Sequence, residues 1–442
     1  MKNKTYLLFL ILAISALFLG ILFGLLASLQ YIFPEFIKSI IPFNEMRPFH
    51  VTTVISWIIL SSTGSIYFYI THEEKLPLFS RILPKIHFSI FLATGIAIYF
   101  SFLTGKTEGR EYLSYSPILT IPILLGWILF GINYFKTILK NVKNWPVYYW
   151  MWGTGIVFMI YHLCEAHFWM IPSFRAHFIK DITVQWKSYG SFVGSWNMLV
   201  YGISIYIMCK IKGDEKFARG KKVFFFYFLG LTNLMFGWAH HTYIIPMQPW
   251  IRYVAYGISM TEWILLIHII YGWKKSLTQQ KKEEFSIAYK FLMIADFWVF
   301  LNLVLALLFS IPVINFFTHG THITVAHSMG TTIGINTSIL LASLFFIASR
   351  LKLKKAFPIK ILLKNIKLYN ISLLLFWIIL LIAGTKRSHW MYFTKSIQFS
   401  EMQDSLYYIY IAFFCFGLLL VTSIVRIVLP LFISFIKKVK IN

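Results

Sequence analysis

The chain of 442 residues is strongly apolar, with 58% hydrophobic and 13% charged residues and a mean hydropathy of +0.70. These values lie outside the range of soluble globular domains and exclude a soluble enzyme or binding module. The formal net charge of +25 would by itself be compatible with a nucleic-acid-binding protein.

Apolar runs long enough to cross a membrane recur along the whole chain. A hydrocarbon core about 30 Å thick is crossed by roughly 20 helical residues at about 1.5 Å per residue. The first run follows Met-Lys-Asn-Lys without a small-residue cleavage site, which predicts a retained helix rather than a signal peptide. We predict an all-α membrane protein, a single twelve-helix domain over residues 1–442, with spans at 5–32, 48–72, 86–104, 117–136, 147–171, 189–209, 223–246, 253–273, 291–313, 321–349, 368–385 and 405–434.

Basic residues gather at alternate ends of these spans. With both termini cytoplasmic, 30 of the 41 Lys and Arg residues lie at the inner ends and 11 at the outer ends. This asymmetry follows the positive-inside rule and explains the net charge without a nucleic-acid partner. The sequence therefore predicts a multi-pass protein of a bacterial inner (cytoplasmic) membrane, with the lipid bilayer as its surroundings.

Histidines from distant parts of the chain are predicted to share one depth near the outer face. His50 opens the span at 48–72, and His240 and His241 lie near the end of the span at 223–246. His327 lies in the first turns of the span at 321–349. Imidazoles on facing helices are typical ligands of haem iron and of non-haem iron or copper.

A single histidine inside a membrane can also be a hydrogen-bonded core residue. Two adjacent imidazoles are harder to explain in this way, because both need a partner in an apolar environment. His240 and His241 therefore indicate a shared metal ion.

Four sequence stretches carry a family resemblance: RPFHVTTVISW from Arg47, GREYLSYSP from Gly109, FGWAHHTYIIP from Phe236 and INFFTHGTHITVAHSMGTTIG from Ile314. In this order on twelve spans, they resemble the catalytic subunit of the haem-copper oxidase superfamily, and more closely its nitric oxide reductase branch. The resemblance covers most of the chain. It implies a low-spin haem b, a high-spin haem b and a non-haem iron or copper.

The resemblance also implies a role for individual residues. His50 matches a ligand of the low-spin haem and His327 the proximal ligand of the high-spin haem, while His240 and His241 match ligands of the non-haem metal. Arg110, inside the GREY motif, is expected to meet a haem propionate. Apart from the resemblance, other residues of outer loops or helix ends could also meet haem propionates, although solvated positions are the simpler interpretation; they are Lys386, Arg387, His177, His319, His322 and His389.

The span at 189–209 departs from the family pattern. Reductases carry HLWVEG there, with a His and a Glu that bind the non-haem iron, whereas this chain has VGSWNML after VQWKSYGSF. Two imidazoles alone would bind a metal weakly, because catalytic sites usually keep three protein ligands. We predict Glu165, three residues after His162 and on the same helix face, as the replacement ligand. The alternative is a hydrogen-bonded core carboxylate or a proton relay.

A second departure lies at the low-spin haem, where the family pattern HxH becomes His327, Ser328 and Met329. A thioether can itself bind haem iron, and His/Met ligation raises the reduction potential. We therefore predict a haem b held by His50 and Met329, with a core methionine as the alternative.

The choice of reaction depends on a tyrosine. Oxygen reductases need a redox-active tyrosine near the metal centre, but the residues before His240 are LTNLMFGWA, and Tyr227 is 13 residues upstream, or about 20 Å. This favours reduction of nitric oxide to nitrous oxide. The alternatives are a terminal oxygen reductase, another nitrogen-oxide enzyme of the superfamily, or a non-catalytic haem b electron-transfer subunit.

Two further expectations concern protons and electrons. Glu262, in the span at 253–273, resembles an acidic residue near the reductase active site, and we predict a role in proton delivery. The electron donor is expected to be a membrane-anchored cytochrome c subunit, with another donor such as quinol as the alternative.

Overall fold

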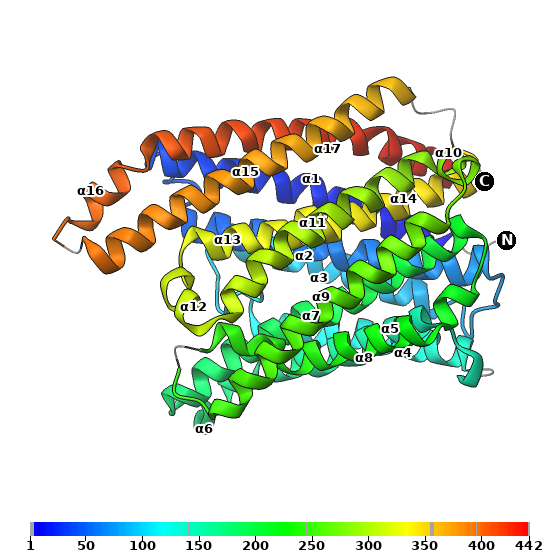
Figure 1. The fold of residues 1–442 in the computed structure, drawn as a ribbon, viewed down its shortest axis with the longest axis horizontal. Helices are drawn as coiled ribbons and strands as arrows, with labels where there is room; N and C mark the ends of the chain where they lie inside the picture. Colours follow the sequence, from blue (N-terminus) through cyan, green and yellow to red (C-terminus); the bar gives the residue numbers. More distant parts are fainter. Residues whose placement is uncertain (1–3, 140–141, 244, 354–357, 395, 441–442) are drawn as a thin grey trace.

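The computed structural model describes residues 4–139, 142–243, 245–353, 358–394 and 396–440, without the side chains of residues 259–268. Long helices lie side by side along one axis, and both chain ends lie at the same end of the bundle (Figure 1). We call this end the terminal end and the opposite one the distal end. The described residues contain no β-strand and one isolated bridge, between Arg110 and Leu113.

The long helices follow the predicted spans. They are α1 (Thr5–Ile32), α2 (Phe43–Phe68) continued by the π-helical turn η1 (Tyr69–Glu73), α3 (Leu83–Leu103), α4 (Thr120–Ile138), α5 (Val147–Glu165), α7 (Phe178–Lys212), α8 (Lys221–Phe236) continued by the 3-10 turn η6 (Gly237–His241), α9 (Pro249–Ser276), α11 (Ser286–Ser310), α13 (His322–Met329), the π-helical segment η7 (Gly330–Thr337), α14 (Ser338–Arg350), α15 (Ile359–Phe393) and α17 (Tyr407–Lys440). Short helices lie in the connections: α6 (Pro172–Arg175), η5 (Lys216–Arg219), α10 (Gln279–Glu284), α12 (Pro312–Thr318) and α16 (Phe399–Asp404).

The all-helical membrane architecture is confirmed. Within the described residues, 10 helical segments are long and apolar enough to cross a membrane. The predicted spans 147–171 and 253–273 fall on α5 and α9, which are not among these 10. The number of twelve spans and the cytoplasmic location of the termini therefore stay predictions.

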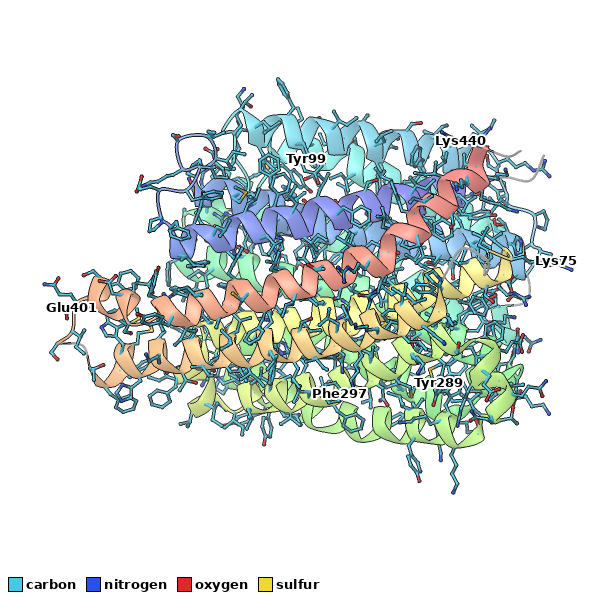
Figure 2. The ribbon with its side chains drawn as sticks, turned by 90° about the horizontal axis from the view of Figure 1, so that it is seen from above. Lys75, Tyr99, Tyr289, Phe297, Glu401 and Lys440 are labelled. Carbon is cyan, nitrogen blue, oxygen red and sulfur yellow. The ribbon has the colours of Figure 1, made fainter. Side chains whose placement is uncertain are left out.

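Several helices extend well past their apolar cores. The helix α7 begins at Phe178, although the predicted span begins at residue 189. Hydropathy locates the part of a helix in hydrocarbon, whereas helical hydrogen bonding continues through interfacial polar residues such as Lys180 and Asp181. The helix ends where Gly213 takes a left-handed φ of 73°. Figures 1 and 2 likewise show α15 and α17 projecting past their neighbours at the distal end, where α16 joins them.

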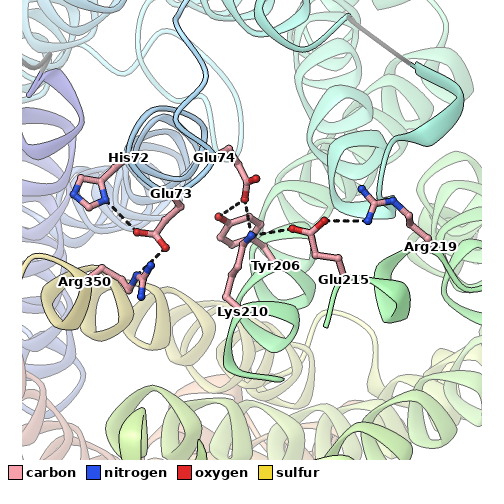
Figure 3. A network of polar contacts seen from close by, with 8 residues as sticks. All are labelled: His72, Glu73, Glu74, Tyr206, Lys210, Glu215, Arg219 and Arg350. Atoms are coloured by element: carbon pink, nitrogen blue, oxygen red, sulfur yellow. Dashed lines mark hydrogen bonds and ion pairs between the residues drawn. The ribbon is translucent and has the colours of Figure 1, made fainter. Parts of the chain in front are cut away.

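A polar network at the terminal end joins η1 to α14 and α7 (Figure 3). The carboxylate of Glu73, whose side chain is 4% exposed, accepts a hydrogen bond from Arg350 Nε at 2.7 Å. His72 Nδ1 lies 3.1 Å from the other Glu73 oxygen. These contacts compensate a carboxylate that would otherwise be buried as an isolated charge.

The same network continues to η5. Glu74 accepts a hydrogen bond from Tyr206 at 2.7 Å and is paired with Lys210 at 2.8 Å. Lys210 also reaches Glu215 at 2.9 Å, and Glu215 pairs with Arg219 at 2.9 Å. Burial raises the pKa of Glu215, but the hydrogen bonds from Lys210 and Arg219 outweigh it, so the pKa lies below its usual value.

Replacing Arg350 by Gln should lower the free energy of unfolding by about 3 kcal/mol, because the nearly buried Glu73 would lose its main cationic partner. The matched variant Arg219→Gln should lower it by less than about 1 kcal/mol, because both partners in that pair are at least one third exposed, at 45% and 35%. Thermal unfolding of the detergent-purified proteins measures both changes. Equal losses from the two variants would contradict this difference.

Candidate metal centre

The adjacent histidines lie where the helix α8 tightens into the 3-10 turn η6. Gly237 begins this turn, and a Cβ there would lie 1.9 Å from Asn233 Oδ1, so a larger residue would require the Asn233 side chain to move. His240 and His241 follow, with ring centroids 4.1 Å apart and planes inclined by 40°. A 3-10 turn has about three residues per turn, so it rotates successive side chains by more than an α-helix does.

Neighbouring helices hold the pair in place. Asn315 Nδ2 donates hydrogen bonds to the carbonyl oxygens of His240 at 2.9 Å and Phe309 at 3.0 Å, which ties α12 to η6. The indole of Trp186 on α7 stacks on His241 with ring centroids 5.8 Å apart at 10°. Sequence patterns did not single out Asn315 or Trp186, because neither residue type is a usual metal ligand.

His319 packs on the other side of Trp186, with centroids 5.7 Å apart. Burial lowers the pKa of His319, and a hydrogen bond with the His241 backbone opposes this shift. The net lowering leaves a neutral imidazole at neutral pH. Trp186 and His319 together cover one side of the histidine pair.

His327 on α13 faces the same region. It lies within electrostatic range of His240 and His241, and its ring packs edge-on against Phe309 at 5.7 Å. Its Nδ1 atom is buried and has no hydrogen-bond partner among the described residues. A buried polar atom of this kind is costly unless a ligand or water satisfies it. The structure thus brings together three imidazoles that the sequence predicted to share a layer.

The predicted third ligand, Glu165, is bonded to other side chains. Glu165 is bonded to His162 Nδ1 at 2.9 Å and to Lys187 of α7, and its side chain is 12% exposed. Among the residues that the structure describes, no three His, Cys, Asp or Glu side chains are grouped so that they could hold one metal ion. The structure therefore does not bring Glu165 to the histidine pair, and its role as a ligand stays a prediction. Glu262 lies in α9, but its side chain is outside the described residues.

The imidazole of His50 sits in a groove of α1. Its Nδ1 lies 2.8 Å from the carbonyl oxygen of Gly20. A Cβ at Gly24 would lie 2.9 Å from the ring, so glycine makes room for the imidazole. A hydrogen bond from Nδ1 to a backbone carbonyl fixes the tautomer and leaves Nε2 able to bind a metal. The surroundings of His50 therefore fit an axial haem ligand.

Hydrogen bonds between α2 and the α13–α14 segment place Met329 at the depth of His50. Trp57 Nε1 donates to Thr337 Oγ1 at 3.1 Å, and the hydroxyls of Ser65 and Ser343 lie 2.8 Å apart. Because both residue numbers rise together, the two segments are parallel. His50 precedes Trp57 by seven residues and Met329 precedes Thr337 by eight. Both therefore lie about two helical turns from the Trp57–Thr337 hydrogen bond, on its distal side.

Arg110 is bonded to protein groups. Its guanidinium pairs with Asp181 at 2.8 Å and lies over the Trp169 ring at 4.7 Å. The turn before it requires Gly109, because a Cβ there would lie 1.9 Å from the carbonyl oxygen of Leu113. The contact of Arg110 with a haem propionate stays a prediction.

A cavity of about 170 Å³ opens between the distal ends of α1, α13, α15 and α17. Its lining includes Tyr31, His322, Val325 and Arg387. The Nδ1 atom of His322 and the Nε atom of Arg387 are buried without a hydrogen-bond partner in the described chain. Val325 is four residues before Met329, so the cavity lies one turn from Met329 toward the distal end, on the same face of α13. Two unpartnered donors at this place fit an anionic group such as a haem propionate.

Comparisons with known proteins agree with this arrangement. The family model for cytochrome c and quinol oxidase polypeptide I matches residues 4–419. A nitric oxide reductase subunit of Stutzerimonas stutzeri is 23% identical over 361 residues, covering 76% of this chain and 73% of the relative.

Cytochrome c oxidase subunit 1 proteins are similar as well. A homologue from Agrobacterium tumefaciens (strain T37) is 22% identical over 359 residues, covering 75% of this chain and 64% of the relative. The protein from Rhodobacter capsulatus is 21% identical over 365 residues, with 75% and 65% covered. The chain thus spans just under two thirds of the length of these two relatives.

A solved structure has the same fold. The cryo-EM structure of a heme-copper terminal oxidase dimer superposes with a TM-score of 0.71 at 13% identity, covering 98% of this chain and 84% of that one. Since the family model matches nearly the whole chain, this protein belongs to the haem-copper oxidase subunit I family, the family of cytochrome c and quinol oxidase polypeptide I.

Proposed function

We propose that this oxidoreductase is the catalytic subunit of a nitric oxide reductase in a bacterial inner membrane, acting in a respiratory chain of denitrification. The observation that carries the proposal is the layer formed by His240, His241 and His327, with His50 and Met329 at matched depth on neighbouring helices. Three imidazoles from η6 and α13 in one apolar layer fit a high-spin haem b facing a non-haem iron or copper.

When bound, the haems and the second metal would supply electrons and Lewis-acid sites for the reaction of two nitric oxide molecules with two electrons and two protons to give nitrous oxide and water. The protein residues supply position. Asn315 fixes the backbone of His240, and Gly20 orients the His50 imidazole. Trp186 and His319 cover the histidine pair and restrict water.

The residues that precede the histidine pair on α8 support nitric oxide rather than oxygen as the substrate. Tyr227 donates or accepts a hydrogen bond with Thr154 of α5 at 2.7 Å, so it is held away from the histidine layer. The residue six positions before His240 is Leu234, which is buried against Gly194 of α7. A two-electron reduction of nitric oxide needs no tyrosine radical.

The non-catalytic alternative is favoured by one observation. No three-ligand group occurs in the described part of the chain, and a metal held by two imidazoles alone would bind weakly. In that case the protein would hold haem b for electron transfer only. A terminal oxygen reductase or another nitrogen-oxide enzyme remains the alternative within the same fold.

The electron donor is proposed to be a membrane-anchored cytochrome c subunit, with quinol as the alternative. The family includes both cytochrome c and quinol oxidases, so family membership does not choose between them. The low-spin haem proposed at His50 and Met329 would lie near the distal end and accept the electrons.

Reduced purified complex should convert nitric oxide to nitrous oxide and contain two haem irons and one further metal per chain. Gas chromatography measures the product and elemental analysis the metals. Replacing His240 by Ala should abolish the second metal and lower turnover at least ~100-fold, because it removes one of the two adjacent imidazoles that we propose as ligands of this metal. Two irons alone in the native complex would support the electron-transfer alternative.

Glu165→Gln and Lys187→Gln separate the two roles of Glu165. In the geometry described above, both variants should keep the second metal and lower stability by about 2 kcal/mol, because each leaves part of a mostly buried ion pair uncompensated. Loss of the metal from Glu165→Gln alone would show that the carboxylate is a ligand.

Gly24→Leu should remove about one haem per chain, because its Cβ alone would lie 2.9 Å from the His50 ring. Gly95→Leu is the matched control, since a Cβ at Gly95 meets nothing within 4 Å. The pyridine haemochrome assay gives the haem content. Full haem content in Gly24→Leu would argue against His50 as a ligand.

Near-infrared magnetic circular dichroism of the oxidised protein should show the thioether band of His/Met ligation. Met329→His should replace this band by a bis-His signal and lower the reduction potential of the low-spin haem, because imidazole stabilises the oxidised iron more than a thioether does. A bis-His signal from the native protein would exclude Met329 as a ligand.

A further inference from the structure

A second cavity lies at the terminal end of the bundle, whereas the candidate metal site lies toward the distal end. It has a volume of about 270 Å³ and lies between the start of α15 and the second half of α17. Its lining consists of Pro358, Ile361, Leu362, Arg426 and Pro430. One charged side chain thus sits among apolar ones.

Arg426 points toward the surroundings of the bundle. It is exposed, and so are Leu419, Leu429 and Ile433 on the same helix, at 44%, 42% and 43%. These positions are separated by three, four or seven residues, so they form one face of α17. A membrane helix exposes such a face to lipid, where an unpaired guanidinium is costly.

No protein group in the described part of the chain neutralises this arginine. It makes no ion pair or hydrogen bond with any residue that the structure describes. The sequence contains no Asp or Glu between Asp296 and Glu401, and none after Asp404. The nearby start of α15 is instead basic, with Lys360 and Lys364 on its first turns. The charge around the cavity therefore selects an anion.

The helix α17 is shaped to leave this space open. Pro430 lies inside the helix, four residues after Arg426, and has no N–H to bond the Arg426 carbonyl oxygen. Ser434 Oγ donates to the Pro430 carbonyl oxygen at 2.7 Å. Figure 2 shows α17 bending on its way to Lys440. Sharp helix kinks commonly occur at proline, and Pro430 itself lines the cavity beside the bend.

We propose that the groove between the start of α15 and Arg426 of α17 binds the phosphate headgroup of an anionic phospholipid in the adjacent membrane leaflet. The Arg426 guanidinium pairs with the phosphodiester, for which its planar fork is well suited. Lys360 and Lys364 add attraction from α15, and an acyl chain lies along the apolar face that includes Leu419. Basic pockets between membrane helices bind anionic headgroups by the same physics.

The test compares the binding of an anionic lipid by the purified complex after reconstitution into nanodiscs. Wild type, Arg426→Gln and Lys290→Gln are reconstituted into nanodiscs of phosphatidylcholine with a minor fraction of phosphatidylglycerol, and native mass spectrometry counts the bound phosphatidylglycerol. Arg426→Gln should bind it about fivefold more weakly, the effect of one basic residue on anionic lipid. Lys290→Gln removes an exposed charge from the first turns of α11, outside the cavity, and should bind as wild type does.

Three results would overturn the proposal. Wild type and Arg426→Gln could bind the same amount of phosphatidylglycerol, with unchanged haem spectra and melting temperature. That result would mean that the Arg426 side chain only extends to the water interface. Displacement of the lipid by millimolar inorganic phosphate would indicate a site for free phosphate instead. Arg426→Lys, which keeps the charge but not the fork, should fall between wild type and Arg426→Gln, and a loss of binding beyond that of Arg426→Gln would also argue against the proposal.

Discussion

The cost of placing an ionisable group in hydrocarbon governs this structure. Every such group must be paired, hydrogen-bonded, bound to a cofactor or held at the interface. Glu73 and Glu165 have cationic partners, and His50 is bonded to a backbone carbonyl. His327 keeps a buried nitrogen without a partner, and Arg426 has none at all in the described chain. Some buried groups stay without a partner in the described chain, both ring nitrogens of His87 among them, so a missing partner indicates a ligand only where other candidate groups lie beside it, as they do at His327.

The membrane architecture could be predicted from sequence because hydropathy is a local property. The first span, 5–32, coincides with α1 (Thr5–Ile32), and most others agree within a few residues. The predicted bounds are too short where a helix continues through polar residues, as in α7 and α15. A stretch of apolar residues shows which part of a helix lies in hydrocarbon, but not where its backbone hydrogen bonds end. The π-helical segment Gly330–Thr337 was also not predicted, since its backbone depends on packing against other helices.

The candidate site was predictable only as far as it depends on depth. Position along a span gave the shared layer of His240, His241 and His327, since depth follows from counting residues. The partner of Glu165 could not be found in this way. Its contact with Lys187 depends on the rotation of α7 relative to α5, which distant packing sets. The space that Gly24 leaves for the His50 imidazole could not be predicted either. It depends on how α1 packs against α2, and a glycine in a single sequence does not show which side chain lies against it.

The position of Glu165 decides how the second metal could be held. A mostly buried carboxylate needs a cationic partner, and Lys187 neutralises Glu165 in this structure. A divalent metal bound by Glu165 would have to compete with that ammonium, and Lys187 would then need another environment for its charge. The side-chain exposure of Lys187, 21%, allows it to turn toward the distal surface, where it would be solvated. The Glu165 carboxylate can therefore bind the metal or pair with Lys187, but not both at once. The favoured arrangement is the one in which fewer charged groups are buried without a partner.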